Sequence, residues 1–196
     1  MHGMRQPPVC PRCSAPVHEP GLMSSAWVCS RHGEVAPFYV GTGPASSEAL
    51  TWTAKTAQVP VWLPWPLPTG WLVSGLAHAG DERTGARATV VAASGPAPLG
   101  GSGEMVLVAE EPGIGLGARY AGLTGTDAGP DALWSVEGAP DRAVYVGEAL
   151  GHWLWVVLWP DSAGLMVLDR FMLVDLRDAG HILDVPLGAA SPRLAP

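Results

Sequence analysis

The sequence predicts an α+β fold in which a small cysteine-containing module precedes a mainly antiparallel β-sheet domain with one or two helices. All three cysteines of the 196-residue chain lie between positions 10 and 29. Beyond position 59, strand-like runs follow one another across turn signals, without the βαβ alternation of a parallel sheet. Apolar residues make up 47% of the chain, which is ample for a core, while 25 Gly and 20 Pro favour short elements.

The chain is expected to divide into four segments. The cysteine module covers residues 1–40, and residues 41–58 form a linker that can start a helix. The sheet domain covers residues 59–190, and residues 191–196 form a tail.

The cysteine module has the ligand spacing of a tetrahedral metal site. Fifteen residues separate the pair Cys10-x2-Cys13 from the pair Cys29-x2-His32. Two residues between ligands allow a tight turn that directs both side chains at one ion, and its backbone N–H groups can bond to the sulfurs. Zinc favours four such ligands, and three Cys with one His is a common structural set. His18, in the intervening loop, is a competing ligand at no favoured spacing.

The segments "CPRC" and "CSRHG" resemble the two knuckles of a zinc ribbon, over about residues 8–40. Ser14 and Gly33 follow the knuckles, where a small or left-handed residue is wanted. The departure from the commonest ribbon is His32 in place of a fourth cysteine. Four ligands close the coordination shell, which indicates a structural rather than a catalytic Zn²⁺.

The whole chain resembles an uncharacterised actinobacterial family. The segments that carry the likeness, besides the ribbon, are "PVWLPWPLPTGW", "GPAPLGG-x-GE", "GLGARYAG" and "DLRDAG". The resemblance implies a zinc ribbon joined to a β-rich domain, and it supplies no known activity.

The next two segments differ in their helix signals. Residues 46–57 can form a helix with Ser46 or Ser47 as its N-cap. Four prolines in residues 59–71 exclude a regular helix or a central strand, so this segment is expected to be extended. The favoured interpretation is that this segment wraps its own domain and buries its tryptophan rings. The alternative is that Trp62 and Trp65, which have no sheet to hide them by alternation, form a contact surface.

The sheet domain is expected to contain two hairpins and a further strand. Residues 70–80 pair with residues 86–95 across "DERTG", residues 142–150 pair with residues 152–160 across Gly151, and residues 104–111 add a strand. In the second hairpin, three tryptophans differ by even numbers and therefore point to one face, the better candidate for the core. They are Trp153, Trp155 and Trp159.

The C-terminal part has two interpretations. Residues 162–180 form either an amphipathic helix, with Ser162 as cap and Gly180 as stop, or two strands. Residues 181–185 are expected to form a last short strand.

A glycine-rich turn follows the strand at residues 104–111. The series Gly113-x-Gly115-x-Gly117, with Arg119 beyond it, can open a helix and cradle a phosphate or acyl phosphate with backbone N–H groups. The series lacks the dinucleotide spacing and no Walker lysine follows, so a plain loop at a sheet edge is the favoured interpretation.

Other polar side chains are most simply explained as solvated turn or strand-edge residues. They are His78, Asp81, Glu82, Glu110, Glu111, His152 and His181. No G-x-S-x-G elbow is present, and the metal motif uses every cysteine, so the sequence predicts no catalytic nucleophile.

Charge argues against a nucleic-acid partner. The net charge is −7: residues 1–40 carry three Arg against two Glu, and residues 41–196 carry eight Lys or Arg against sixteen Asp or Glu. Neither part has the basic stripe that phosphate binding requires. Without a secretory signal or a membrane-spanning run, the protein is expected to be cytoplasmic, where thiols stay reduced.

The leading hypothesis is therefore a non-enzymatic, zinc-binding regulatory or assembly module that binds another protein or a small ligand, with homo-oligomerisation open. The alternative is an enzyme that acts on a phosphorylated or acylated small molecule at the Gly113–Arg119 loop. A nucleic-acid-binding zinc ribbon is a further alternative.

Overall fold

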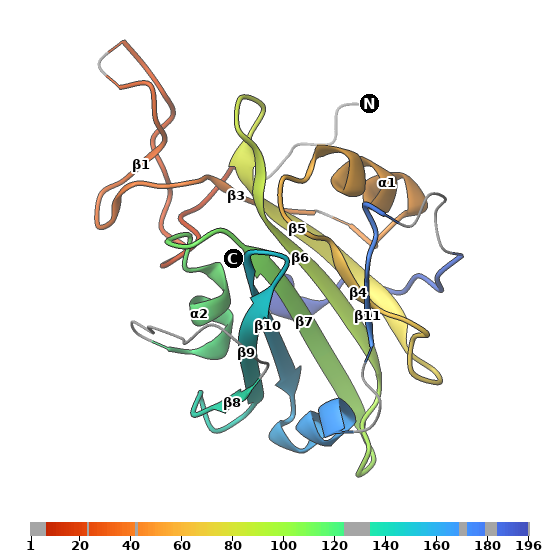
Figure 1. Cartoon of the computed structure of the whole chain (residues 1–196). Helices are drawn as coiled ribbons and strands as arrows, with labels where there is room; N and C mark the ends of the chain where they lie inside the picture. Colours follow the sequence, from red (N-terminus) through yellow and green to blue (C-terminus); the bar gives the residue numbers. More distant parts are fainter. Residues whose placement is uncertain are drawn as a thin grey trace.

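A seven-stranded antiparallel sheet forms the centre of the computed structural model, in the order β3-β5-β6-β7-β10-β9-β8 (Figure 1). The structure describes residues 7–22, 24–41, 43–123, 134–168, 172–178 and 184–195. The strands of the sheet are β3 (Phe38–Val40), β5 (Leu72–Asp81), β6 (Gly85–Pro96), β7 (Ser102–Glu110), β8 (Trp134–Val136), β9 (Ala143–Ala149) and β10 (His152–Trp159). The α+β class is confirmed.

Both expected hairpins are present. Strands β5 and β6 pair from Leu72↔Ser94 to Asp81↔Gly85, and β9 and β10 pair next to the turn at His152↔Ala149. Strand β7 lies between the hairpins and pairs with β6 on one side and β10 on the other. No helix in the described part of the chain has the length and apolar character needed to cross a membrane.

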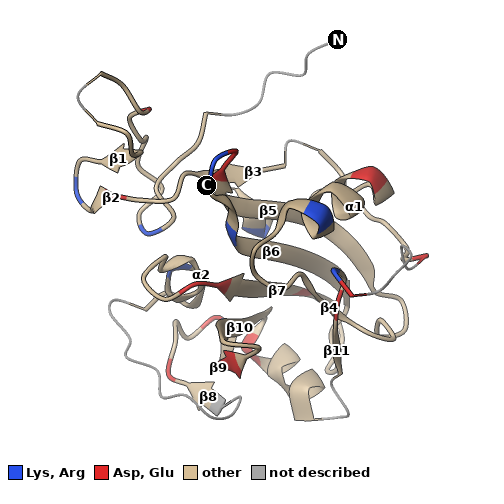
Figure 2. Cartoon of the chain, turned by 45° about the horizontal axis from the view of Figure 1, so that its top comes forward, with Lys and Arg blue, Asp and Glu red and all other residues tan. Residues whose placement is uncertain are grey.

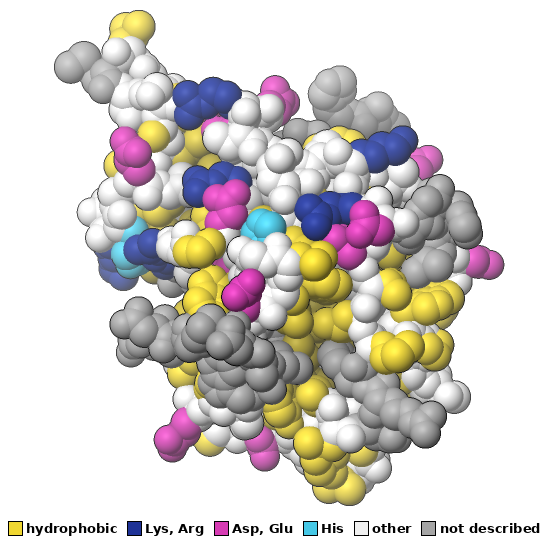
Figure 3. Space-filling view, viewed as in Figure 1, with side chains coloured by type: hydrophobic (Ala, Val, Ile, Leu, Met, Phe, Trp, Pro, Cys, Tyr) yellow, Lys and Arg dark blue, Asp and Glu magenta, His cyan; other side chains and the backbone are white. Residues whose placement is uncertain are grey.

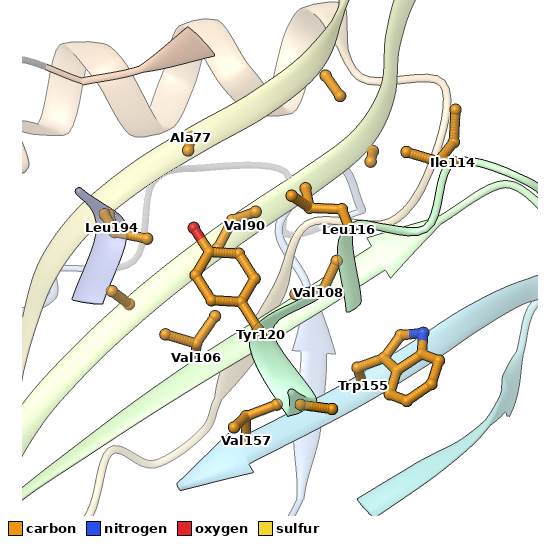
Figure 4. Close-up of a cluster of buried hydrophobic side chains, with 14 of the residues drawn as sticks. Ala77, Val90, Val106, Val108, Ile114, Leu116, Tyr120, Trp155, Val157 and Leu194 are labelled. Carbon is orange, nitrogen blue, oxygen red and sulfur yellow. The ribbon is translucent and has the colours of Figure 1, made fainter. Parts of the chain in front are cut away.

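One face of the sheet is covered by helix α2 (Leu116–Ala121) and the 3₁₀ helix η2 (Pro192–Leu194). Leu116, Tyr120 and Leu194 pack there on alternate residues of the strands, such as Val90 and Val106 (Figure 4). Burial of these apolar side chains on a sheet face is the main stabilising contribution here.

The other face carries helix α1 (Ser47–Thr56), the strand pair β4 (Trp62–Pro64) with β11 (Leu173–Asp175), and the 3₁₀ helix η1 (Asp161–Leu168). The expected helix after the linker is confirmed as α1. Its N-cap is Ser46, whose Oγ accepts a hydrogen bond from the Ala49 N–H at 3.1 Å. The extended, proline-rich segment before β5 also packs on this face of the sheet.

The tryptophans of β10 and of the proline-rich segment lie in different parts of the core. Trp155 and Trp159 are buried in the α2 face, with Trp153 at its rim, so the single-face prediction for β10 is confirmed. For Trp62 the interpretation that the proline-rich segment buries its own rings is confirmed: its side chain is buried, because β4 gains a partner in β11, more than 100 residues away. Trp65 is half-buried.

Of the two interpretations of residues 162–180, the single amphipathic helix is wrong, and the strand interpretation is confirmed for Leu173–Asp175. The 3₁₀ helix η1 ends at Leu168, and residues Leu173–Asp175 pair with β4 as β11. The Asp175 carboxylate accepts the Val61 N–H at 3.0 Å, and this tertiary pairing overrides local helix propensity. Of the expected last strand, residues 181–183 lie outside the described residues, and Asp184 and Val185 are not in a strand.

Candidate metal centre

The side chains of Cys10, Cys13, Cys29 and His32 converge at one point of the N-terminal module. Their ligand atoms all lie within 4.8 Å of one another. The Cys10 Sγ to His32 Nδ1 distance is 3.5 Å, the Cys13 Sγ to Cys29 Sγ distance is 3.8 Å, and the Cys29 Sγ to His32 Nδ1 distance is 3.7 Å. All three thiols are free, so this cluster can hold a metal ion.

Two tight turns bring the ligands together. In the first, the Ser14 N–H donates to the Cys10 carbonyl at 2.9 Å, and Ser14 has a left-handed φ of 57°. The second lies between the short strands β1 (Val28–Cys29) and β2 (Gly33–Glu34), and Gly33 has a φ of 68°. The left-handed residue expected after each knuckle is therefore present at both positions.

The second turn also prepares a sulfur for metal binding. The Arg31 N–H donates to Cys29 Sγ at 3.5 Å. Burial acts to raise the pKa of the Cys29 thiol, but the N–H groups of Arg31 and His32, together with hydrogen bonds to the His32 and Cys10 side chains, lower that pKa below its usual value. Burial raises the pKa of the Cys10 thiol instead, so a bound cation is needed to hold Cys10 as a thiolate.

His18 takes a different role. Its backbone N–H and carbonyl pair with Val28 across the ribbon, at 2.9 and 3.0 Å. Among the described residues, the group that can hold a metal does not include His18.

The metal cluster is attached to the sheet domain at two places. Val9 and Phe38 exchange two backbone hydrogen bonds, at 3.0 and 2.9 Å, immediately before the first ligand. Arg12, between the first two ligands, donates from Nε to the Ile114 carbonyl at 3.2 Å and from Nη2 to the Gly113 carbonyl. The first knuckle therefore contacts the glycine-rich turn directly.

The backbone N–H groups that begin α2 are occupied by an internal carboxylate. The Leu116 N–H donates to Glu110 Oε2 at 2.7 Å, and the Gly117 N–H donates to Glu110 Oε1 at 3.1 Å. Gly113 and Gly115 have φ values of 88° and 80°, which let the chain fold back over the end of β7. The turn thus places an internal carboxyl group where a phosphate would bind.

Glu110 corrects the expectation of a solvated acidic pair. Its side chain is buried, and burial raises its pKa to about 7, although the donated N–H groups act in the opposite direction. Glu111 stays half-buried and forms an ion pair with Arg87 at 2.7 Å.

A family model matches residues 4–194, almost the whole chain. The chain belongs to this family, a family of unknown function (DUF6758). The match includes the cysteine module and the sheet together. No curated protein and no solved structure matches the chain significantly.

The other predicted candidates lie apart from the metal cluster. His78 stacks on Tyr39, with ring centroids 5.3 Å apart, and also contacts Trp52. The Asp81 carboxylate accepts the N–H groups of the following turn, where Glu82 is exposed. The His152 ring lies 2.8 Å from the Leu150 carbonyl. His181 lies outside the described residues.

Sequence reasoning missed Arg12 and misplaced Glu110. Arg12 lies between two ligands and resembles any solvated knuckle residue, because its acceptors are about 100 positions away. Glu110 did carry a signal: an acidic residue just before a glycine-rich turn into a helix can neutralise that helix start.

Proposed function

We propose that this protein is a zinc protein in which Zn²⁺ has a structural role, and that it serves as a non-enzymatic binding module for another protein or a small-molecule ligand. The observation that carries the zinc proposal is the convergence of the four side chains within 4.8 Å. Cys10, Cys13, Cys29 and His32 would hold the ion.

The ligand distances fit zinc. In a tetrahedral site with Zn–S near 2.3 Å and Zn–N near 2.0–2.1 Å, sulfur atoms lie about 3.8 Å apart and sulfur and nitrogen atoms about 3.6 Å apart. The observed S···S distance of 3.8 Å and S···N distances of 3.5 and 3.7 Å agree with these values. The soft thiolate set also favours zinc over magnesium or calcium.

Two features support a structural role. Three sulfurs and one nitrogen complete a tetrahedral shell, so no position remains for water or substrate. The contact of Arg12 with Gly113 and Ile114 links the ordered knuckle to the turn before α2. Zinc would therefore fix the ribbon and brace the start of α2.

The alternatives have less support. An enzyme that holds phosphate on the glycine turn would have to displace Glu110 from the Leu116 and Gly117 N–H groups. For a nucleic-acid-binding ribbon, basic side chains should form a continuous stripe. Figure 2 shows basic and acidic positions interspersed along the chain, and on the face shown in Figure 3 basic side chains lie beside acidic ones.

The cysteines and the overall composition support a cell compartment and a source organism for the protein. Free cysteines and a thiol-rich metal site agree with a cytoplasmic location. One lysine against ten arginines, with many Ala, Gly and Pro, agrees with a GC-rich actinobacterial source.

Metal analysis tests the zinc proposal. Protein purified without a histidine tag should contain about one equivalent of zinc by elemental mass spectrometry, as a single four-ligand site requires. Cys13→Ser and Cys29→Ser should each lose most of it, because each removes one of four ligands. Ser30→Ala, within the second knuckle but not a ligand, should retain it. Wild type free of zinc, or full zinc in both cysteine variants, would refute the proposal.

A further inference from the structure

Arg119 and Tyr120, neighbours on α2, carry buried donors that lack hydrogen-bond acceptors. The Arg119 guanidinium carbon lies 5.2 Å from the Phe38 ring centroid and 5.3 Å from that of Tyr120. Arg119 Nη1 and the Tyr120 hydroxyl are both buried, and neither has a hydrogen-bond partner within the described part of the chain. The Tyr120 side chain is only 5% exposed.

Such a pair calls for a physical explanation. Most buried side-chain polar atoms in proteins have a partner, and an unpaired one often marks a missing water, ion or ligand. An unpaired buried donor destabilises the fold by its full desolvation penalty, which is larger for a charged group. The Arg119 guanidinium can only donate and the Tyr120 hydroxyl can donate, so one acceptor could satisfy both groups.

The absence of a paired carboxylate at Arg119 among the described residues also indicates a missing acceptor. Four other arginines form ion pairs with carboxylates: Arg87, Arg142, Arg177 and Arg193. Among the residues whose placement is described, no carboxylate pairs with Arg119, and its guanidinium lies over the rings of Phe38 and Tyr120. One unbalanced positive charge in a largely apolar setting favours one negative charge.

The surroundings of the Tyr120 ring are apolar. Figure 4 shows the ring leaving α2 toward the sheet, between Val106 and Val90, with its hydroxyl directed toward Ala77 and Leu194. Arg119 is half-buried, so solvent reaches part of this side chain. A ligand here would present a charged acceptor to Arg119 and Tyr120 and apolar groups to their neighbours.

We propose that Arg119 and Tyr120 form a binding site for a monoanionic carboxylate that carries an apolar body. The guanidinium pairs with the carboxylate, and the Tyr120 hydroxyl donates to one of its oxygens. A phosphate dianion fits less well, because a single guanidinium leaves its second charge buried and unbalanced. This site goes beyond the proposed zinc role and is separate from the Leu116 and Gly117 N–H groups, which Glu110 occupies.

Thermal melts of the zinc-loaded protein test the site. Sodium acetate, butyrate, hexanoate and phosphate are compared with sodium chloride at equal ionic strength. Wild type should gain melting temperature with the carboxylates, most with hexanoate, because a ligand that binds only the native state stabilises it. Arg119→Met and Tyr120→Phe should lose this gain. Arg83→Met, which changes an exposed turn arginine, should keep it.

Calorimetric titration with hexanoate gives a second readout. Each of the two variants should bind at least about tenfold more weakly, since a hydrogen bond to a charged group is lost. Without ligand, Tyr120→Phe should melt at the wild-type temperature, because it removes only an unpaired hydroxyl.

Four results would overturn the proposal. They are no stabilisation of wild type by any carboxylate, equal stabilisation of wild type and both variants, a larger effect of phosphate than of hexanoate, and a ligand-free Tyr120→Phe protein that is clearly less stable. The last result would show that the hydroxyl already has a partner, such as a bound water. None of these results bears on zinc content.

Discussion

Glu110 joins the end of β7 to the start of α2 through a single buried carboxylate. Its two oxygens accept the Leu116 and Gly117 N–H groups, which would otherwise be unpaired at the helix start. Helix α2 also packs closely on β10, because a Cβ added at Gly117 would lie only 2.1 Å from Trp155 Cδ1. Glu110 therefore has to remain buried, because α2 sits directly on the sheet.

The raised pKa of Glu110 predicts a pH-dependent stability. The pKa of Glu110 is about 7 in the folded protein and about 4.5 in an unfolded chain, so between these pH values the folded state retains a proton that the unfolded state releases. The free energy of unfolding should therefore fall as pH rises through this range. Relative to Glu110→Gln, which cannot titrate, wild type should lose about 2–3 kcal/mol between pH 5 and pH 8.

Denaturant unfolding of both zinc-loaded proteins at several pH values measures this difference. Protonation of the metal ligands affects both proteins and cancels in the comparison. A difference that is flat, or that increases with pH, would show that Glu110 is not held in a desolvated site.

At the scale of an element, Trp155 of strand β10 is expected to contribute more to stability than Trp65 of the proline-rich segment. Trp155 is 3% exposed and packs against α2, whereas Trp65 lies half-buried in the proline-rich segment beside β4. We expect Trp155→Ala to reduce the free energy of unfolding by about 3–5 kcal/mol, through lost burial and a cavity. Trp65→Ala should reduce it by about 1 kcal/mol or less.

Equilibrium unfolding of the two variants gives the comparison, with circular dichroism as a check that each retains the sheet. Comparable losses in both variants would mean that the proline-rich segment is as much a part of the core as β10.

Local signals explain which elements could be predicted. Both hairpins follow from alternation and turn residues within about 25 positions, and α1 follows from Ser46. The β4–β11 pair could not be predicted in the same way, because its partners are distant and one of them is proline-rich. The same limit applies to the site: the ligand spacing is local, whereas the acceptors of Arg12 are not.

At the scale of the whole molecule, the N-terminal cysteine module projects from one end of the sheet (Figure 1). Its strands β1 and β2 have two residues each, so it has little core of its own. The bound metal would then supply most of its folding free energy. The seven-stranded sheet has an extensive core on both faces and does not share this dependence.

Zinc removal should therefore affect two regions that are far apart in the sequence. After chelation, hydrogen exchange should increase in residues 9–38, where the ribbon loses its centre. It should also increase in residues 113–117, because Arg12 no longer has a fixed position beside Gly113 and Ile114. The hairpin of β9 and β10 should remain protected, as its hydrogen bonds lie within the sheet.

Arg12→Met separates the two effects. With zinc bound, this variant should keep the ribbon protected and yet exchange about tenfold or more faster at residues 113–117, since a hydrogen bond from a charged group contributes about 1.5–3 kcal/mol. Arg31→Met, an exposed arginine in the second knuckle, is the matched control and should exchange like wild type. If residues 113–117 are unchanged both after chelation and in Arg12→Met, the metal centre does not brace α2, and zinc would serve the ribbon alone.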